Sequence, residues 1–304
     1  MILIQSRNTI IFLLILFFTV VISFSFTSQS AAETDSITIG LLPEMNVFKQ
    51  RQRFKPLAAY LSDNLGIQVK LIILSRYGNI VQRIKEQQID AAFLGSFTGA
   101  LAISQLGVEP LARPINKDGT STYFGHIFAR KDSGIKSVAD MQGKTLALVE
   151  RATTAGYIFP LAWFKRNGVE DIASFFSEHY FAGSHDATID AVLKGQADIG
   201  AGKNTIYDRV RAANPRIDKE LVILASSPRV PSNGLCVRPD MDKQYKTKLK
   251  ELLLNLHHNP KGLEVLEKLG AKRFVDTSRE DYQPVLDMAA EAGIDIKNYK
   301  YFNP

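Results

Sequence analysis

The sequence has almost no cysteine, because Cys236 is the only one among 304 residues. A single cysteine excludes an intramolecular disulfide, and a lone thiol in an oxidising compartment is usually buried. Cys236 lies in the short apolar run 234–237 (GLCV), which is typical of a buried strand. We therefore predict that Cys236 is a core residue rather than a nucleophile or a metal ligand.

Catalytic and metal-binding signatures are also missing. The chain contains no G-x-S-x-G elbow, no H-E-x-x-H pair, no Walker A pattern and no cysteine pair for zinc. His257 and His258 are adjacent, so a helix would point them about 100° apart, which makes a poor metal pair. These absences favour a binding protein without catalytic residues, metal or cofactor. A hydrolase is the alternative, which an assay with phosphate esters would test.

Neither basic nor acidic residues are in strong excess. The chain carries 37 Lys and Arg residues against 31 Asp and Glu residues, a formal net charge of +6. This scattered surplus slightly favours anionic solutes and does not form the basic stripe of a nucleic-acid-binding protein. We therefore predict a small anionic ligand and no nucleic-acid partner.

The N-terminal segment has a single charge. Arg7 is the only charged residue in 1–32, the run 10–22 is almost entirely apolar, and 30–32 (SAA) supplies small residues at the end. This order is that of a secretory signal peptide, so we predict cleavage after residue 32 and a periplasmic location. An uncleaved anchor is the alternative, because the apolar run is near the lower limit of about 17 residues for a spanning helix. Residues 23–35, which follow this run, contain no cysteine, and this argues against a lipoprotein anchor.

Short apolar runs alternate with amphipathic patterns along the remaining chain. The runs 37–42 (ITIGLL) and 68–74 (QVKLIIL) predict strands, and 54–65 between them carries apolar residues at helical spacing. Strands that alternate with helices of this length predict a mostly parallel sheet covered on both faces. The fold class is therefore α/β.

The same alternation restarts after the polar stretch 116–122 (NKDGTST), which predicts two lobes. We place lobe 1 at 33–122 and 232–304, and lobe 2 at 123–231. The chain would then cross between the lobes twice, near 116–130 and 226–238, and the two crossing segments would form a hinge.

Three loops rich in Gly, Ser and Thr follow strands and open helices: 95–99 (GSFTG), 152–156 (ATTAG) and 182–186 (AGSHD). A helix start has unpaired N–H groups and a partial positive charge, so it attracts an anion. Ligands of open α/β sheets bind at the carboxyl ends of the strands, where these loops lie. Each loop alone could be an ordinary N-cap worth about 1 kcal/mol. Three together favour an oxyanion site.

Seven residues are the candidate ligand contacts. Ser96, Thr153 and Thr154 offer hydroxyls, Ala155 a backbone N–H, His185 an imidazole donor, Tyr77 a ring and hydroxyl, and Asn204 an amide. The alternatives are that His185 packs or caps, that Tyr77 is a surface or core residue, and that Asn204 caps a helix beside a solvated Lys203.

Several stretches in this order resemble the phosphate-, phosphite- and phosphonate-binding periplasmic proteins of ABC transporters. They are 56–61 (PLAAYL), 75–78 (SRYG), 132–140 (DSGIKSVAD), 143–144 (GK), 156–157 (GY) with Pro160, 183–186 (GSHD) and 195–198 (GQAD). The resemblance covers residues 37 to about 269. It implies a two-lobed, type II solute-binding fold, a phosphorus oxyanion ligand, an ABC transporter permease as partner and a monomer.

The resemblance also implies roles for single residues and shows three departures. A Ser-Thr-Ser-Gly loop cradles the oxyanion in that family, and its third hydroxyl position is Ala155 here. The family often has an aromatic residue just before the glycine that follows the third strand, and Leu94 stands there in this chain. Some members have an acidic residue that binds a ligand amine, and that position falls at Lys203 or Asn204 here. The last departure argues against an aminophosphonate. A sensor of the same fold acting on a membrane histidine kinase is the alternative to a transport protein.

Overall fold

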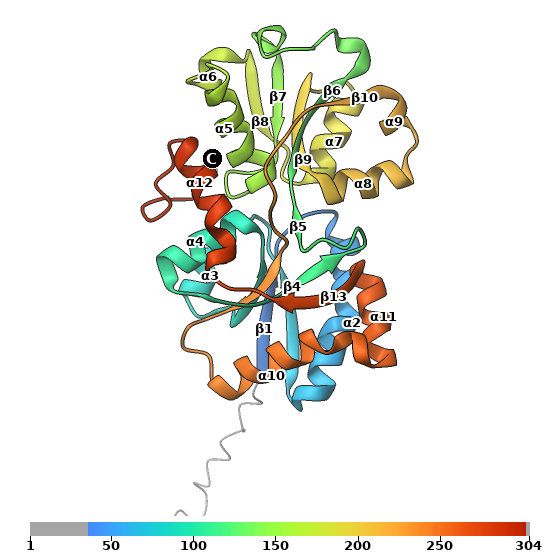
Figure 1. Cartoon of the computed structure of the whole chain (residues 1–304), viewed down its shortest axis with the longest axis vertical. Helices are drawn as coiled ribbons and strands as arrows, with labels where there is room; N and C mark the ends of the chain where they lie inside the picture. The colour runs from blue at the N-terminus through green and yellow to red at the C-terminus, as the bar shows by residue number, and fades with distance from the viewer. Residues whose placement is uncertain (1–35, 302–304) are drawn as a thin grey trace, which may run out of the picture. The chain divides into compact units, whose positions relative to one another are not determined.

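The computed structural model describes residues 36–301, so the expected signal peptide in 1–32 lies outside the described residues. Two sheets organise this part of the chain (Figure 1). The six-stranded sheet has the order β13 (Ala271–Asp276), β4 (Glu109–Asn116), β12 (Gly234–Val237), β3 (Ala91–Leu94), β1 (Ser36–Leu41), β2 (Gln68–Ile73). The five-stranded sheet has the order β10 (Leu221–Ser226), β6 (Gly125–Arg130), β9 (Ile199–Lys203), β7 (Thr145–Leu148), β8 (Glu178–Phe181).

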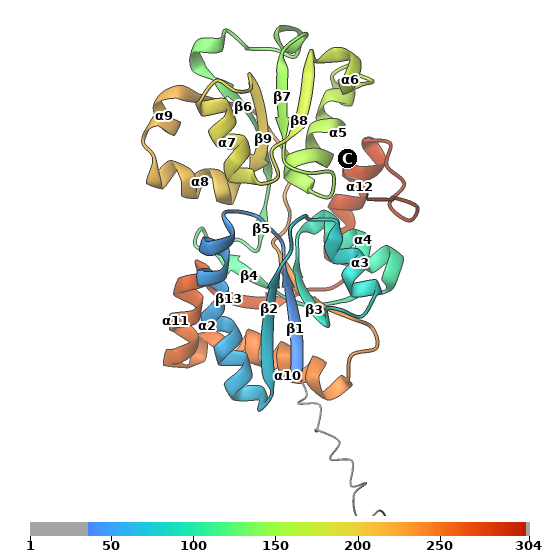
Figure 2. The same ribbon diagram turned by 180° about the vertical axis from the view of Figure 1, so that it is seen from behind.

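Helices cover both sheets (Figures 1 and 2). Around the six-stranded sheet lie α2 (Val47–Leu65), α3 (Asn79–Lys85), α4 (Ser96–Leu106), α10 (Lys243–Leu254) and α11 (Pro260–Leu269). Around the five-stranded sheet lie α5 (Phe159–Arg166), α6 (Ile172–Phe175), α7 (His185–Leu193), α8 (Asn204–Ala213) and α9 (Arg216–Glu220). Short 3₁₀ turns occur at Lys131–Ser133, Ala139–Met141, Leu256–His258 and Glu280–Tyr282, and a π-helix at Thr154–Ile158 precedes α5.

The chain crosses between the sheets twice, and the crossing segments pair with each other. Strand β5 (Thr122–Tyr123) forms a small antiparallel ladder with β11 (Val230–Pro231). This two-lobed architecture with two connections is the fold class that the sequence predicts. The first lobe is the part built on the six-stranded sheet, and the second lobe is the part built on the five-stranded sheet.

The expectation of mostly parallel sheets is wrong. Strands β1, β2 and β3 are parallel to one another, as are β7, β8 and β9, but β12 runs antiparallel to β3 and β6 runs antiparallel to β9. The crossings explain the difference. Strand β6 enters its sheet at the end where β9 finishes, so β6 runs opposite to β9. Strand β12 enters its sheet at the end where β3 finishes, so β12 runs opposite to β3.

Helix α2 begins earlier than the apolar pattern predicts, at Val47 rather than at residue 54. The Asn46 side chain accepts hydrogen bonds from the N–H groups of Phe48 and Lys49, which caps the first turn. The first two turns are mostly exposed, so they lack the apolar periodicity that marks the rest of the helix. The helix ends at Gly66, whose φ of 74° is left-handed.

Buried apolar residues in the described part of the chain form four clusters: two mainly in the first lobe, one mainly in the second, and one that both lobes share. The shared core joins residues of α4, such as Phe97, with residues of β6, β7 and α5. The C-terminal helix α12 (Gln283–Glu291) contacts both α4 and α5. Cys236 is buried in β12 as predicted, and burial raises its thiol pKa to about 12. Within 36–301, no helix combines the length and apolar character needed to cross a bilayer.

Candidate functional site

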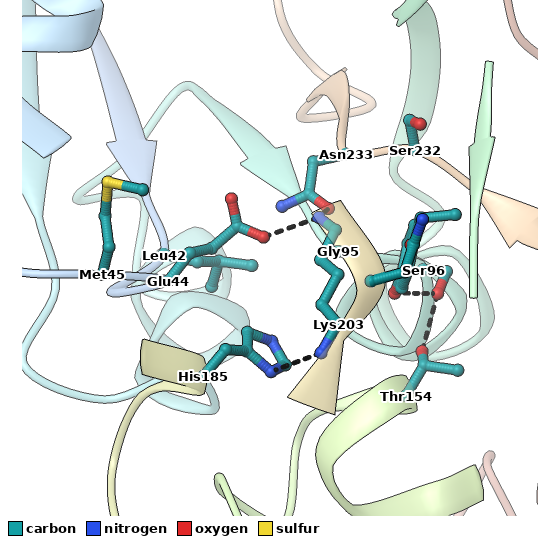
Figure 3. A network of polar contacts seen from close by, with 12 residues as sticks. Leu42, Glu44, Met45, Gly95, Ser96, Thr154, His185, Lys203, Ser232 and Asn233 are labelled. Atoms are coloured by element: carbon teal, nitrogen blue, oxygen red, sulfur yellow. Dashed lines mark hydrogen bonds and ion pairs between the residues drawn. The ribbon is translucent and has the colours of Figure 1, made fainter. Parts of the chain in front are cut away.

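Three hydroxyls from different segments meet where the two lobes face each other. Ser96 begins α4 in the first lobe, Thr154 begins the π-helix of the second lobe, and Tyr123 lies on the crossing strand β5. The Ser96 Oγ atom is 2.6 Å from Tyr123 Oη and 2.6 Å from Thr154 Oγ1, and Figure 3 shows the contact between Ser96 and Thr154. All three side chains are buried. We call these residues the hydroxyl cluster.

Internal contacts fix the conformation of the loop 152–156, which the sequence identifies. Thr153 is at the N-cap position, and its Oγ1 donates to the Glu150 carbonyl at 2.6 Å. Ala155 is buried in the first turn, where N–H groups have no intrahelical acceptor. A Cβ atom on Gly156 would lie 2.3 Å from Val149 Cγ2, so only glycine lets the loop pack this closely. The loop therefore offers the Thr154 hydroxyl and backbone N–H groups.

His185 is buried at the first position of α7, and Ser184 caps that helix. The imidazole Nδ1 accepts a hydrogen bond from the Lys203 backbone N–H at 3.2 Å. Burial lowers the pKa of His185 to about 4, although the Glu44 carboxylate opposes this shift. The imidazole is therefore neutral at pH 7, and its proton sits on Nε2, which can donate to an anion.

Tyr77 is buried beside His185, with its ring edge-on and the ring centroids 6.2 Å apart. Its backbone N–H donates to Glu150 Oε2 at 2.6 Å. Its hydroxyl has no hydrogen-bond partner among the described residues, although it is fully buried. A buried hydroxyl without a partner costs about 1–3 kcal/mol, so this group needs an acceptor or donor from elsewhere.

Asn204 is not the helix cap of the alternative interpretation. Its Oδ1 accepts from the Phe124 N–H at 3.0 Å, and its own N–H donates to the Phe124 carbonyl at 2.9 Å. This two-way bond ties the start of α8 to the crossing segment. Asn204 is not a cap, because Lys203 occupies the N-cap position of α8. Its amide Nδ2 stays available as a donor.

Lys203 is not the solvated lysine of the alternative interpretation, because its side chain is buried between the lobes. The Nζ atom lies 2.7 Å from Glu44 Oε1 and 2.8 Å from Asn233 Oδ1, and Figure 3 labels these three residues. It also lies 4.3 Å from the centroid of the Tyr123 ring. Burial alone would raise the pKa of Glu44, but the Lys203 ammonium overcomes it and lowers the pKa to about 2. Burial lowers the pKa of Lys203, and Glu44 opposes that shift.

The structure therefore brings most of the predicted residues together and adds three. Ser96 and Thr154 bond each other, Tyr77 lies beside His185, and His185 is linked to Lys203. Sequence reasoning missed Tyr123, Glu44 and Asn233. Glu44 follows Pro43 directly after the first strand, a carboxyl-end position that could have pointed to it. Tyr123 and Asn233 lie in polar crossing segments, where no pattern singles them out.

Two sheets joined by two crossing strands, with buried hydrogen-bond donors from both lobes at the junction, define the class of two-lobed solute-binding proteins. The family model for the ABC transporter, phosphonate, periplasmic substrate-binding protein matches residues 39–282, and the chain belongs to that family.

Relatives and solved structures agree with this assignment. The phosphonates-binding periplasmic protein of Escherichia coli K12 is 23% identical over 286 residues, which cover 89% of this chain and 84% of that protein. A binding component of an ABC phosphonate transporter from Pseudomonas aeruginosa has a TM-score of 0.79 at 22% identity, covering 86% of this chain and 87% of that chain. PhnD1 from Prochlorococcus marinus, solved with methylphosphonate, has a TM-score of 0.76 at 20% identity, covering 85% and 98%.

Proposed function

We propose that this protein captures a phosphorus oxyanion (a phosphonate, phosphite or phosphate) outside the cytoplasm, delivers it to the permease of an ABC importer and does no chemistry on it. Membership of the family supports the transport role, and the names of two relatives, one phosphonates-binding and one in complex with methylphosphonate, support the ligand class. In this proposal the protein acts as a monomer, and the signal peptide 1–32 is removed.

The observation that carries the proposal is the contact of 2.6 Å between the Ser96 and Thr154 hydroxyls, which come from opposite lobes. Either hydroxyl can be the donor, so both protons can rotate towards an anion placed beside the pair. The Tyr123 hydroxyl, already bonded to Ser96, can turn in the same way. A small oxyanion would then replace one hydroxyl contact with several charge-assisted hydrogen bonds, which are stronger than neutral ones.

Further donors surround this position in the proposal. His185 would donate from Nε2, and Tyr77 would satisfy its unpartnered hydroxyl on the ligand. Ala155 would contribute a backbone N–H. Thr153 would hold the loop in place, because its hydroxyl and its backbone N–H both donate to the Glu150 carbonyl, at 2.6 and 3.1 Å. The partial positive charge of the helix start would favour the anion as well.

Because the donors belong to both lobes, binding would favour the closed arrangement over an open one. We propose lobe boundaries at 33–122 with 232–304, and at 123–231. The paired crossing strands β5 and β11 would then absorb the change in angle between the lobes.

Calorimetric titration of Thr154→Ala with methylphosphonate, phosphite and phosphate tests the proposal. The variant should bind its best ligand about 1–3 kcal/mol more weakly than the parent, the range for a lost charge-assisted hydrogen bond. Thr247→Ala, an exposed threonine on α10, is the matched control and should bind as the parent does. Unchanged affinity in Thr154→Ala would remove the loop from the site. Failure of all three anions to bind would remove the ligand class, and turnover of phosphate esters by the parent would contradict a pure binding role.

A further inference from the structure

A cavity of about 660 Å³ lies beside the Glu44–Lys203 pair, between the start of α2 in the first lobe and α8 in the second. Small-molecule sites typically occupy about 300–1,000 Å³, so this cavity exceeds what phosphate or methylphosphonate needs. Lys203 lies between the hydroxyl cluster and the cavity. Its ammonium contacts the Tyr123 ring of the hydroxyl cluster on one side and Glu44, a cavity residue, on the other. A ligand held by the hydroxyl cluster therefore has the cavity as its neighbour.

Cationic side chains outnumber acidic ones on the cavity wall. Six Lys and Arg residues line it against four Asp and Glu residues: Lys49, Arg53, Lys117, Lys203, Arg209 and Lys268 against Glu44, Asp118, Asp208 and Glu267. Three of the acids are ion-paired, Glu44 with Lys203, Asp208 with Arg211 and Glu267 with Lys117. The fourth, Asp118, accepts from the Thr120 N–H at 2.9 Å.

Four of the cations have no ion-pair partner within 36–301, namely Lys49, Arg53, Arg209 and Lys268. Arg53 is the most constrained, because its Nε and Nη2 atoms donate to the Leu269 carbonyl at 3.0 and 2.6 Å. That carbonyl orients the guanidinium without neutralising its charge. Arg209 Nη1 donates to the Met45 sulfur at 3.9 Å. The two guanidinium groups therefore lack a carboxylate at ion-pair distance within the described residues, although the Glu44 carboxylate attracts both of them from farther away.

The two guanidinium groups also affect each other. Burial lowers the pKa of Arg53 to about 10, and repulsion by Arg209 adds to this shift. Arg53 lies on α2 and Arg209 on α8, and two such cations lining one cavity are unfavourable unless an anion comes between them. A guanidinium binds carboxylate and phosphate groups through two parallel hydrogen bonds, so these are the groups that the wall is suited to bind.

We propose that the cavity binds a second anionic group of the same ligand, so that the preferred ligand is an organophosphorus compound bearing a carboxylate or a second phosphoryl group. This inference rests on the proposed function, because the first phosphoryl group is placed at the hydroxyl cluster. Arg53 and Arg209 hold the second group, and the cavity determines which spacer length fits between the two anionic ends.

A matched ligand series tests the inference by calorimetry. Phosphonoacetate, 3-phosphonopropionate and 4-phosphonobutyrate are each compared with the alkylphosphonate of the same carbon number. One spacer length should let the ligand reach from the hydroxyl cluster to the cavity wall. At that length the phosphonocarboxylate should bind roughly ten- to a hundredfold tighter than the matching alkylphosphonate, the gain expected for a hydrogen-bonded charge pair. Equal or weaker binding of all three carboxylates would overturn the inference.

Two variants assign the effect to the cavity wall. Arg53→Gln and Arg209→Gln should each remove most of the carboxylate gain and leave alkylphosphonate affinity within about twofold, since each removes one charged hydrogen-bond donor. Arg51→Gln, an exposed residue of the same helix, is the control and should keep the gain. A gain that survives both cavity variants overturns the inference. If alkylphosphonates bind and only the carboxylate gain is missing, the proposed function stands alone. If no phosphorus compound binds, the proposed function fails and the inference fails with it.

Discussion

The two polar groups that join the lobes differ in kind. The hydroxyl cluster joins Ser96 to Thr154 through neutral groups that can each donate or accept. The second group joins Glu44 to Lys203 through a buried ion pair, with Asn233 as a further acceptor. The first can turn towards an anion at little cost, whereas the second is fixed, because either charge left alone would be buried without compensation. Under the proposed function, ligand selection and lobe closure therefore rest on different residues.

The ion pair gives the largest effect expected from this comparison. Lys203→Met leaves the Glu44 carboxylate buried without its cation, so we expect the free energy of unfolding to fall by about 3–5 kcal/mol. Urea denaturation followed by circular dichroism measures the change. The double variant Glu44→Leu with Lys203→Met removes both charges and should recover most of the loss. A single variant as stable as the parent would show that the pair contributes nothing.

The acid sensitivity of His185 gives the next largest effect. Its pKa is about 4 in the folded protein against an ordinary value of 6.5, so the unfolded chain binds the proton first as the pH falls. The stability contribution is complete above pH 6.5 and is lost between pH 6.5 and 4, by about 3 kcal/mol in total. Glu44, with a pKa of about 2, loses its contribution at lower pH.

Urea denaturation at a series of pH values checks this second expectation. His185→Gln should flatten the dependence between pH 6.5 and 4, whereas His258→Gln, at an exposed position, should leave it unchanged. The same slope in His185→Gln and the parent would mean that other groups cause the acid sensitivity.

The hydroxyl cluster should respond less than the ion pair. Ser96→Ala removes the common partner of Tyr123 and Thr154, which leaves two buried hydroxyls without their partner. We expect the free energy of unfolding to fall by about 1–3 kcal/mol, which urea denaturation would measure. Ser104→Ala is the control, because this serine is exposed on the same helix. A loss as large as that of Lys203→Met would erase the distinction between the two groups.

Asn204 should show the smallest effect, because it connects the crossing segment to α8 through one neutral side-chain bond. Asn204→Ala should lower the free energy of unfolding by about 1 kcal/mol. It should also weaken oxyanion binding less than Thr154→Ala does, as calorimetry would measure. Equal losses of affinity in the two variants would place Asn204 among the main ligand contacts.

Local patterns predicted much of this architecture. Alternating apolar runs predicted the strands, and the loops of Gly, Ser and Thr predicted where helices α4 and α7 begin. The same loops led to Ser96, Thr154 and His185, because the position of a residue after a strand is a local property. The antiparallel direction of β6 and β12 was not predicted, since strand direction depends on where the chain crosses between the sheets.

By itself, the sequence determined the α/β class, the restart of the pattern after residue 116 and the hydroxyl-bearing loops, because hydrophobic periodicity and turn chemistry act over a few residues. Only the tertiary structure decided that Lys203 is buried against Glu44, 159 positions away, and that Arg53 and Arg209 line one cavity. Such pairings depend on how the two lobes meet, and the charge of a side chain does not reveal which partner or which cavity it will face.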